Sequence, residues 1–283
     1  MLYYCYKTGR YFARKLRIET CYRVATIVAD VYYFFAREDK RCLKHNMEIV
    51  LGVKDKKLIR GYAKNVFRNF AKYLADFFRV TRREQDSMMQ DISVEGKENL
   101  DKALASGKGA ILLSAHIGNW ELGAGVIACM GYPLHAVVLA HKDKRINDFF
   151  LEQRTACGVK VIGLGAQLKN CFKILKKNKA LAIVGDRDFS NYGLSVNFFG
   201  QPAVLPKGPA FFSVRTGAPI IGTFLLRTKD DKFKLFFEEA VHPKKTGDHD
   251  ADMRDSMSRY IPQLEKYIKR FPDQWYAYRK VWE

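Results

Sequence analysis

The residues best suited to chemistry lie where an apolar stretch, Ile111–Ala115, leads into the segment His-Ile-Gly-Asn-Trp-Glu. An imidazole titrates near neutrality and can therefore act as a general base. We expect His116 to take a proton from a substrate. We expect Glu121 to hold the other ring nitrogen, which would fix the tautomer and stabilise the imidazolium. Gly118 would permit the tight turn that brings the glutamate back towards the ring.

The spacing of His116 and Glu121 is a weak signal when taken alone. With six His and about one acidic residue in nine, chance predicts about half a match in this chain. None of the other five histidines has an acid five positions later. The context strengthens the signal, because His116 follows a predicted strand, and α/β proteins place their sites at the carboxyl edge of the sheet.

The segment Asp186-Arg187-Asp188 also follows a predicted strand. A D-x-D sequence at a sheet edge can ligate the divalent metal of a sugar nucleotide, which is typical of a glycosyltransferase. Alternatively, one aspartate simply caps the next turn. The residues alone leave both interpretations open.

The elements that must position these residues alternate from residue 109 onwards, as expected for an α/β sheet. Predicted strands cover 110–114, 134–140, 159–163, 181–185, 220–226 and 233–241. Predicted helices cover 120–130, 145–157, 167–177, 206–216 and 253–270, the last interrupted or bent at Pro262. We divide the chain into a basic, aromatic-rich helical region, 1–90, and an α/β domain, 91–283.

The N-terminal region has a distinct charge and hydropathy pattern. Residues 1–90 hold 20 Lys+Arg against nine Asp+Glu. An apolar segment, Val24–Ala36, has basic residues on both flanks, which favours a helix lying in a membrane interface over a buried core helix. Residues 62–79 show the apolar spacing of an amphipathic helix. No small-x-small cleavage site follows the apolar segment, so we expect it to be retained.

The whole chain has 283 residues, a formal charge of +19 and 48% hydrophobic residues. This composition excludes a disordered tail protein, and the absence of a long uninterrupted apolar run excludes a polytopic transporter. The charge indicates an acidic partner, such as an anionic membrane, a phosphorylated substrate, an acidic carrier protein or nucleic acid. The six cysteines are widely spaced and predict buried thiols in a reducing compartment.

The segment Ala115-His-Ile-Gly-Asn-Trp-Glu121 resembles the His-x4-Asp/Glu block of the bacterial lipid A biosynthesis acyltransferases, within the lysophospholipid acyltransferase superfamily. Further segments are similar to those of the same family: Arg41–Gly52, Arg154–Gly158, Gly185–Asp188, Val196–Gly200, Pro206–Ala210 and Phe271–Tyr276. The resemblance runs from about residue 20 to the end of the chain. The apolar segment near the N-terminus is shorter and more interrupted than the membrane helix usual in the family.

The resemblance implies transfer of a fatty acyl chain from acyl-ACP or acyl-CoA to a hydroxyl of a lipid A precursor or a related glycolipid or lysolipid. It implies catalysis by His116 and Glu121, without an acyl-enzyme, a metal or a cofactor beyond the thioester co-substrate. Arg154 would stabilise the oxyanion or grip an acceptor phosphate, with a surface helix charge as the alternative. The residues implied for substrate binding are Arg154, Asp186, Arg187, Gly118 and Asn119.

The implied fold is a mixed central sheet flanked by helices on both faces, like glycerolphosphate acyltransferase, with an N-terminal helical membrane attachment. The implied partners are anionic membrane lipid, a carrier-protein or CoA thioester, and a phosphorylated glycolipid acceptor, at the cytoplasmic face of the bacterial inner membrane. The lysines of 169–179 form either a solvated helix face or a docking site for an acidic carrier protein.

Two other functions stay open on the sequence. A metal-dependent glycosyltransferase would use Asp186-Arg187-Asp188, although the His-x4-Glu block has no role in that scheme. A non-enzymatic basic membrane-binding protein would account for the charge but has no use for a histidine at the end of a strand. No recognised nucleic-acid motif is present, so nucleic acid is not expected as a partner.

Overall fold

A computed structural model describes residues 2–79, 89, 91–189 and 192–282 of the chain. The chain begins with the helices α1 (Leu2–Lys15), α2 (Ile18–Phe35), α3 (Arg37–Leu51) and α4 (Lys56–Arg79). The strands are β1 (Ile92–Glu95), β2 (Ala110–Ser114), β3 (Leu134–Val138), β4 (Lys160–Gly163), β5 (Ala180–Val184), β6 (Leu194–Phe198), β7 (Gln201–Leu205), β8 (Ile220–Arg227) and β9 (Phe233–Phe237). The later helices are α6 (Lys97–Ala105), α7 (Trp120–Cys129), α8 (Lys144–Ala156), α9 (Lys169–Lys176), α10 (Gly208–Thr216) and α11 (His249–Arg270), with short 3-10 helices η1 (Ala166–Leu168) and η2 (Pro272–Gln274).

The centre of the molecule is a mixed seven-stranded sheet in the order β1-β9-β8-β2-β5-β3-β4, and β6 and β7 form a separate hairpin. Strands β8, β2, β5, β3 and β4 run parallel, whereas β9 is antiparallel to β8. The register places Ser114 of β2 opposite Val184 of β5. The segments that follow these two residues therefore leave the same edge of the sheet side by side.

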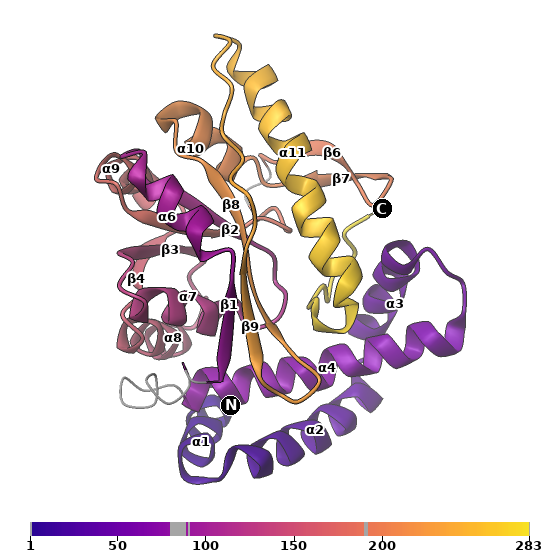
Figure 1. Cartoon of the computed structure of the whole chain (residues 1–283). Coiled ribbons are helices and arrows are strands. Elements are labelled where there is room, and N and C mark those ends of the chain that lie inside the picture. The colour runs from indigo at the N-terminus through magenta and orange to yellow at the C-terminus, as the bar shows by residue number, and fades with distance from the viewer. Residues whose placement is uncertain (1, 80–88, 90, 190–191, 283) are drawn as a thin grey trace.

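Helices cover both faces of this sheet (Figure 1). Because successive side chains of a strand point to opposite faces, Ile111 and Leu113 join a core shared with α9, α10 and α11. Ala110 and Leu112 of the same strand join a second core with α6 and α7. The predicted mixed sheet with helices on both faces is confirmed.

The N-terminal helices pack on the first of these cores. That core contains Tyr33 of α2, Met47 of α3 and Phe67 of α4. A third cluster joins Ala13 of α1 to α4 and α8. In Figure 1, α1 and α2 lie at the end of the molecule opposite α9 and α10. Residues 80–88 and 90, which belong to the predicted N-terminal region, lie outside the described residues.

Helix α2 shows that the apolar N-terminal segment is helical but is not a buried core helix. Only Cys21, Ala29 and Tyr33 of its 18 residues are buried. Its large apolar side chains recur along one face and are 49–75% exposed: Val24, Ile27, Val28, Val31, Tyr32, Phe34 and Phe35. Among the described residues, no helix combines the length and the apolar character needed to cross a bilayer.

Some predicted elements differ from the structure in extent. Strand β9 ends at Phe237, and only Val241 of the remaining predicted segment pairs again, in an isolated bridge with Ile220. Helix α11 begins at His249, where Asp248 caps it, and continues without interruption through Pro262. The hairpin of β6 and β7 was not predicted. Four of the six cysteines are buried, whereas Cys5 and Cys129 are exposed.

Candidate active site

The central pair of the site is His116 with Asp186, one at the end of each of two neighbouring strands. Each residue lies two positions beyond a paired residue of β2 or β5. The His116 ring nitrogen Nδ1 is 2.7 Å from Asp186 Oδ1, and the His116 backbone N–H donates to the same oxygen at 3.1 Å. The prediction that Glu121 holds this ring nitrogen is therefore wrong. The bond to Nδ1 leaves Nε2 as the nitrogen that can take a proton.

Asp186 is an inaccessible carboxylate, because its side chain is 0% exposed. Its second oxygen, Oδ2, accepts a hydrogen bond of 2.8 Å from Trp275 Nε1. Burial acts to raise the pKa of Asp186, but His116, Arg187 and Trp275 outweigh it and hold this pKa well below its usual range. Asp186 thus stays ionised and orients His116. Its side chain is buried and does not line the cavity described below, so this placement gives no support to the prediction that Asp186 binds an acceptor.

Glu121 lies in the first turn of α7 and pairs with Arg154 of α8. Arg154 Nε donates to both carboxylate oxygens, at 3.1 and 2.9 Å, and Nη2 donates to Oε1 at 2.5 Å. The two side chains are only 11–12% exposed. The planar guanidinium matches a carboxylate in this two-pronged way, which explains why Glu121 turns to Arg154 and away from the imidazole. Arg154 is a partly buried, paired cation and not a surface helix charge.

Gly118 and Asn119 build the turn below the site and do not line the cavity. Gly118 has φ +61°, and a Cβ atom there would lie 2.1 Å from the carbonyl oxygen of Leu225. Asn119 is 1% exposed and caps α7, accepting a hydrogen bond of 3.1 Å from Leu122 N. Their absence from the cavity lining gives no support to the prediction that these two residues bind substrate. They are needed for the backbone path between His116 and α7.

Arg187 and Asp188 follow the buried carboxylate. Arg187 Nη2 donates to the carbonyl oxygen of Tyr276, and its buried Nε has no hydrogen-bond partner among the described residues. Asp188 Oδ2 accepts a hydrogen bond of 2.8 Å from Gly193 N. Since both oxygens of Asp186 are used by His116 and Trp275, the two aspartates do not form an open pair of metal ligands. This geometry argues against the glycosyltransferase alternative.

The C-terminal segment contributes contacts to the candidate site that we did not predict. Besides Trp275, this segment supplies Tyr276, whose N–H donates to the His116 carbonyl at 2.8 Å, and Gln274, whose carbonyl accepts from Gly118 N at 3.0 Å. Gln274 also exchanges two side-chain hydrogen bonds with the backbone of Arg227. The only sequence signal was the similarity of Phe271–Tyr276 to a family segment. That similarity did not reveal a contact with the histidine turn.

A cavity of about 730 Å³ extends from His116 over the sheet. The cavity is lined by residues from the neighbouring strand ends and from α7, α9 and α10. The polar and charged residues that line it include His116, Glu121, Arg154, Arg187, Lys169 and Lys207. Its floor includes Val137, Val138, Ile183 and Val184, which are only half-buried although they belong to central strands. Central parallel strands are normally buried on both faces. Here the apolar floor is open to a ligand.

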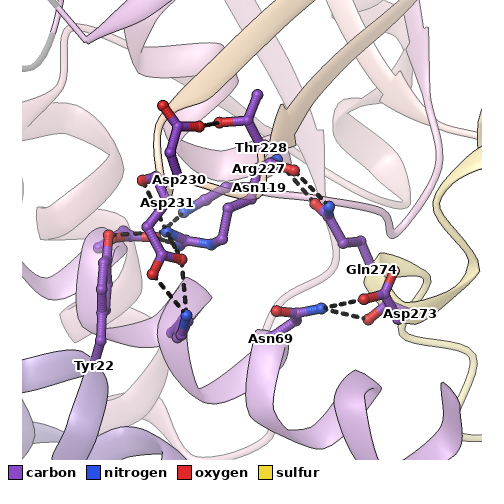
Figure 2. A network of polar contacts seen from close by, with 11 residues as sticks. Tyr22, Asn69, Asn119, Arg227, Thr228, Asp230, Asp231, Asp273 and Gln274 are labelled. Atoms are coloured by element: carbon purple, nitrogen blue, oxygen red, sulfur yellow. Dashed lines mark hydrogen bonds and ion pairs between the residues drawn. The ribbon is translucent and has the colours of Figure 1, made fainter. Parts of the chain in front are cut away.

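A second cavity, of about 900 Å³, lies between α2, α4 and the β8–β9 turn. It borders a network of polar contacts centred on Arg227, with Tyr22 and Asp231 on one side and Gln274 on the other (Figure 2). Arg227 pairs with the buried Asp76, which also accepts a hydrogen bond of 2.6 Å from the Tyr22 hydroxyl.

The network reaches the turn that follows His116 through Asn119. The side-chain amide of Asn119 donates to Asp76 at 3.3 Å. Burial raises the pKa of Asp76, although Arg227 opposes this effect. Because its charges are paired with one another, we assign this network a structural role and place the site at His116.

Comparison with known proteins finds a matching family model and several related enzymes. The model of the family described as "Bacterial lipid A biosynthesis acyltransferase" matches residues 5–283. A phosphatidylinositol mannoside acyltransferase of Mycobacterium tuberculosis is 27% identical over 198 residues, which cover 68% of this chain and 62% of that protein.

Two further relatives support the comparison. The phosphatidylinositol mannoside acyltransferase of Mycolicibacterium smegmatis is 24% identical over 85% of this chain and 78% of its own length. A lipid A biosynthesis palmitoleoyltransferase of Escherichia coli is 25% identical over 64% of this chain and 58% of its own length.

Proposed function

Because the chain belongs to the bacterial lipid A biosynthesis acyltransferase family, we propose that it transfers a fatty acyl chain from a thioester to a hydroxyl of a glycolipid or lysolipid. The donor is an acyl-carrier-protein thioester (acyl-ACP) or acyl-CoA. The observation that carries the proposal is the His116–Asp186 pair, bonded at 2.7 Å, beside a cavity with an apolar floor. A base next to an apolar chamber suits a reaction between a hydroxyl and a fatty acyl group.

In the proposed mechanism, His116 Nε2 removes the proton of the acceptor hydroxyl as its oxygen attacks the thioester carbonyl carbon. A carbon–oxygen bond forms, the carbonyl oxygen becomes negative, and the carbon–sulfur bond then breaks. The departing thiolate takes the proton from the imidazolium, so the products are an ester and a thiol. Asp186 holds Nδ1 and stabilises the positive charge of the ring during the transfer.

The negative oxygen needs a donor in the cavity. Arg154 donates to Glu121 through Nε and Nη2, and no described residue accepts a hydrogen bond from its Nη1. Arg187 also lines the cavity and is bound through Nη2. We propose that Arg154 stabilises the oxyanion and that Arg187 binds an anionic group of the acceptor. Glu121 then acts indirectly, because it fixes the guanidinium of Arg154.

The apolar floor formed by β3 and β5 binds the acyl chain in this proposal. Each methylene group that leaves water for such a surface gains about 0.8 kcal/mol. The acceptor is a phosphorylated glycolipid of the kinds named for the relatives, a lipid A precursor or a phosphatidylinositol mannoside. No metal or further cofactor enters the mechanism.

The exposed apolar face of α2 attaches the protein to a membrane in this proposal. Arg23 lies on α2 and Arg37 and Lys40 follow it, so cations border the apolar side chains. An amphipathic helix of this kind binds in the plane of an anionic interface. We therefore place the protein peripherally on the cytoplasmic face of the bacterial inner membrane, where thioester donors are made and lipid acceptors are present.

The experiment is an acyl-transfer assay on the purified protein. Acyl-ACP and acyl-CoA are each offered with a lipid A precursor or a phosphatidylinositol mannoside, and the products are identified by mass spectrometry. His116→Ala is expected to lower kcat by about 10²–10⁴-fold, the range for a lost general base. Wild-type transfer with one donor and one acceptor supports the proposal and identifies both.

The matched control is His249→Ala, which removes an exposed histidine at the start of α11. Both variants are first compared with the wild type by circular dichroism and thermal unfolding, so that a folding defect is recognised. Full transfer by folded His116→Ala would refute the mechanism. Absence of transfer by the wild type with every donor and acceptor pair would refute the proposed function.

A further inference from the structure

The surface around α9 carries an excess of positive charge that the transfer mechanism does not use. From Gly158 to Gly217 the sequence contains nine Lys+Arg but only two acids, Asp186 and Asp188. Asp186 is buried in the catalytic pair, and Asp188 lines the cavity. The basic side chains outside the site therefore have no acid in their own segment of the chain.

Three of these lysines form one row along α9. Lys169, Lys173 and Lys176 are spaced four and three residues apart, so they project from one side of the helix. All three are exposed, whereas Cys171 and Leu175 on the opposite side are fully buried. At 1.5 Å per residue, the row is about 10 Å long. No described acid forms an ion pair with any of the three.

The row continues beyond the end of α9. Lys177 is exposed, and Asn178 accepts a hydrogen bond of 2.9 Å from Gly109 N, which places Lys108 beside this end of the helix. Lys108 in turn lies close to Lys245, because both would contact a Cβ atom at Gly217. We define the α9 face as Lys108, Lys169, Lys173, Lys176, Lys177 and Lys245.

The α9 face begins at the proposed active site. Lys169, the first residue of α9, lines the 730 Å³ cavity, as does Lys207 just before α10. A ligand that lies along the row therefore reaches the cavity at one end. The head group of a small thioester would occupy the lysines near Lys169 alone. A row that runs on to Lys177 and Lys108 fits a larger anionic surface.

The α9 face lacks the features of a membrane contact. None of the large apolar side chains of α9 is exposed, unlike α2, where seven such side chains are 49–75% exposed. In Figure 1, α9 and α2 lie at opposite ends of the molecule. With α2 on the membrane, α9 points towards the aqueous phase, where its occupant must be soluble.

We propose that the α9 face docks an acidic protein that carries the acyl thioester on a prosthetic arm and delivers it into the cavity beside Lys169. This proposal rests on the proposed acyl transfer and selects a carrier protein as the donor. Opposite charges on two proteins speed their encounter and fix their orientation, and salt weakens both effects. The lipid acceptor would then approach from the membrane side and the donor from the aqueous side.

The test compares two charge-reversal triples of equal charge. The first, Lys173→Glu/Lys176→Glu/Lys177→Glu, changes the α9 face but no residue that lines the cavity. The control, Lys54→Glu/Lys56→Glu/Lys57→Glu, changes one exposed lysine in the loop before α4 and two in the first turn of α4. Acceptor lipid is supplied in neutral detergent micelles, so that membrane binding does not limit the rate.

With acyl-ACP as donor, the α9 triple is expected to raise KM at least tenfold and to change kcat less than twofold. The control triple and every reaction with acyl-CoA should stay within twofold of wild type. An unchanged KM for acyl-ACP would overturn the proposal. An equal loss with both donors would also overturn it, because the lysines would then act on the fold or on the shared thioester arm.

The proposal and the proposed function fail in different ways. If the wild type transfers from neither donor, acyl transfer is refuted. Binding of fluorescently labelled ACP, followed by anisotropy at low and high salt, then still tests the surface: the α9 triple should bind at least tenfold more weakly than the control. Equal binding by the two triples would refute the docking surface independently.

Discussion

At the scale of single residues, the site depends on which acid pairs with which base. Asp186 binds the imidazole of His116, and Glu121 binds the guanidinium of Arg154. Exchanging these partners would place on the histidine a carboxylate that is 11% exposed. In the structure, His116 is held by the fully buried carboxylate of Asp186, and Trp275 donates a hydrogen bond to the other oxygen of that carboxylate. The proposed general base therefore has a defined tautomer before any substrate binds.

Replacing Asp186 by Asn is expected to lower kcat by about 10²–10⁴-fold, because the amide does not stabilise the imidazolium and permits the wrong tautomer. Glu121→Gln is expected to lower kcat by a smaller factor, since Glu121 acts only through Arg154. Transfer assays over a range of pH measure both variants. A larger loss for Glu121→Gln than for Asp186→Asn would contradict the assignment.

Asp186 also predicts how stability depends on pH. Because its pKa in the folded protein lies below the unfolded value, ionised Asp186 stabilises the fold above the ordinary aspartate pKa of about 4. This contribution is lost as the pH falls from about 4 through the folded pKa. Urea unfolding of wild type and Asp186→Asn at pH 3 to 7 should show a difference that shrinks on acidification. Asp255→Asn, at a more exposed ion pair, should show a smaller change.

The sequence predicts the position of His116 but not its partner, for a physical reason. A strand-end histidine is visible locally, as an apolar run that stops at a Gly-Asn turn. Its partner lies 70 residues away and becomes a neighbour only because β5 pairs with β2. The strand order is set by packing over the whole sheet, so spacing within one segment pointed to the nearer acid, Glu121.

At the scale of elements, the turn between β2 and α7 fixes the direction of the site. Asn119 ends the turn as the cap of α7, and its backbone N–H donates to the carbonyl of Leu225 at 2.9 Å. Gly118 passes so close to that same carbonyl that no Cβ atom fits. Strand β2, Gly118 and the capping residue Asn119 thus place His116 next to the first turn of α7.

Gly118→Ala is expected to destabilise the fold by more than about 1 kcal/mol, because a side chain is both strained at positive φ and blocked by the Leu225 carbonyl. Gly107→Ala is the matched control, since Gly107 has φ +73° but no atom within 4 Å of its Cβ position. Urea unfolding of the two variants separates steric blocking from backbone strain. Equal losses of stability would show that the close approach to Leu225 has no effect.

Strands with a continuous apolar run were predictable, whereas strands with mixed faces were not. Strand β2 is almost wholly buried, and its limits match the prediction. In β6, by contrast, exposed and partly buried residues alternate, and β7 contains Pro202, so the hairpin does not resemble a core strand in sequence. In α11, Pro262 is exposed, and the helix continues past it because tertiary packing outweighs the local preference.

At the scale of the whole molecule, charge and apolar surface are distributed to different ends. The apolar face of α2 and its basic neighbours lie at one end, and the α9 face lies at the other. The proposed active site lies between them. In the proposed orientation, the α2 end faces the lipid and the α9 end faces the aqueous phase, and no described helix is long and apolar enough to cross a bilayer.

Val31→Asp/Phe35→Asp is expected to weaken binding to anionic phospholipid vesicles more than tenfold, since each buried side chain of this size contributes about 1.5–3 kcal/mol. The control, Val94→Asp/Val204→Asp, places the same charges at exposed apolar positions outside α2. Vesicle co-sedimentation measures both variants. If the two bind equally, the membrane contact does not lie on α2.

The buried contact of Asp76 with Arg227 has a consequence for how this protein can be dissected or engineered. Tyr22 and Asp76 belong to α2 and α4, yet they supply partners for Arg227 at the end of β8 and for Asn119 beneath the histidine. A chain shortened to begin at β1 would keep a buried guanidinium but lose its deepest counter-charge. Replacing the N-terminal helices by a foreign membrane tether would therefore remove contacts that support the turn between His116 and α7.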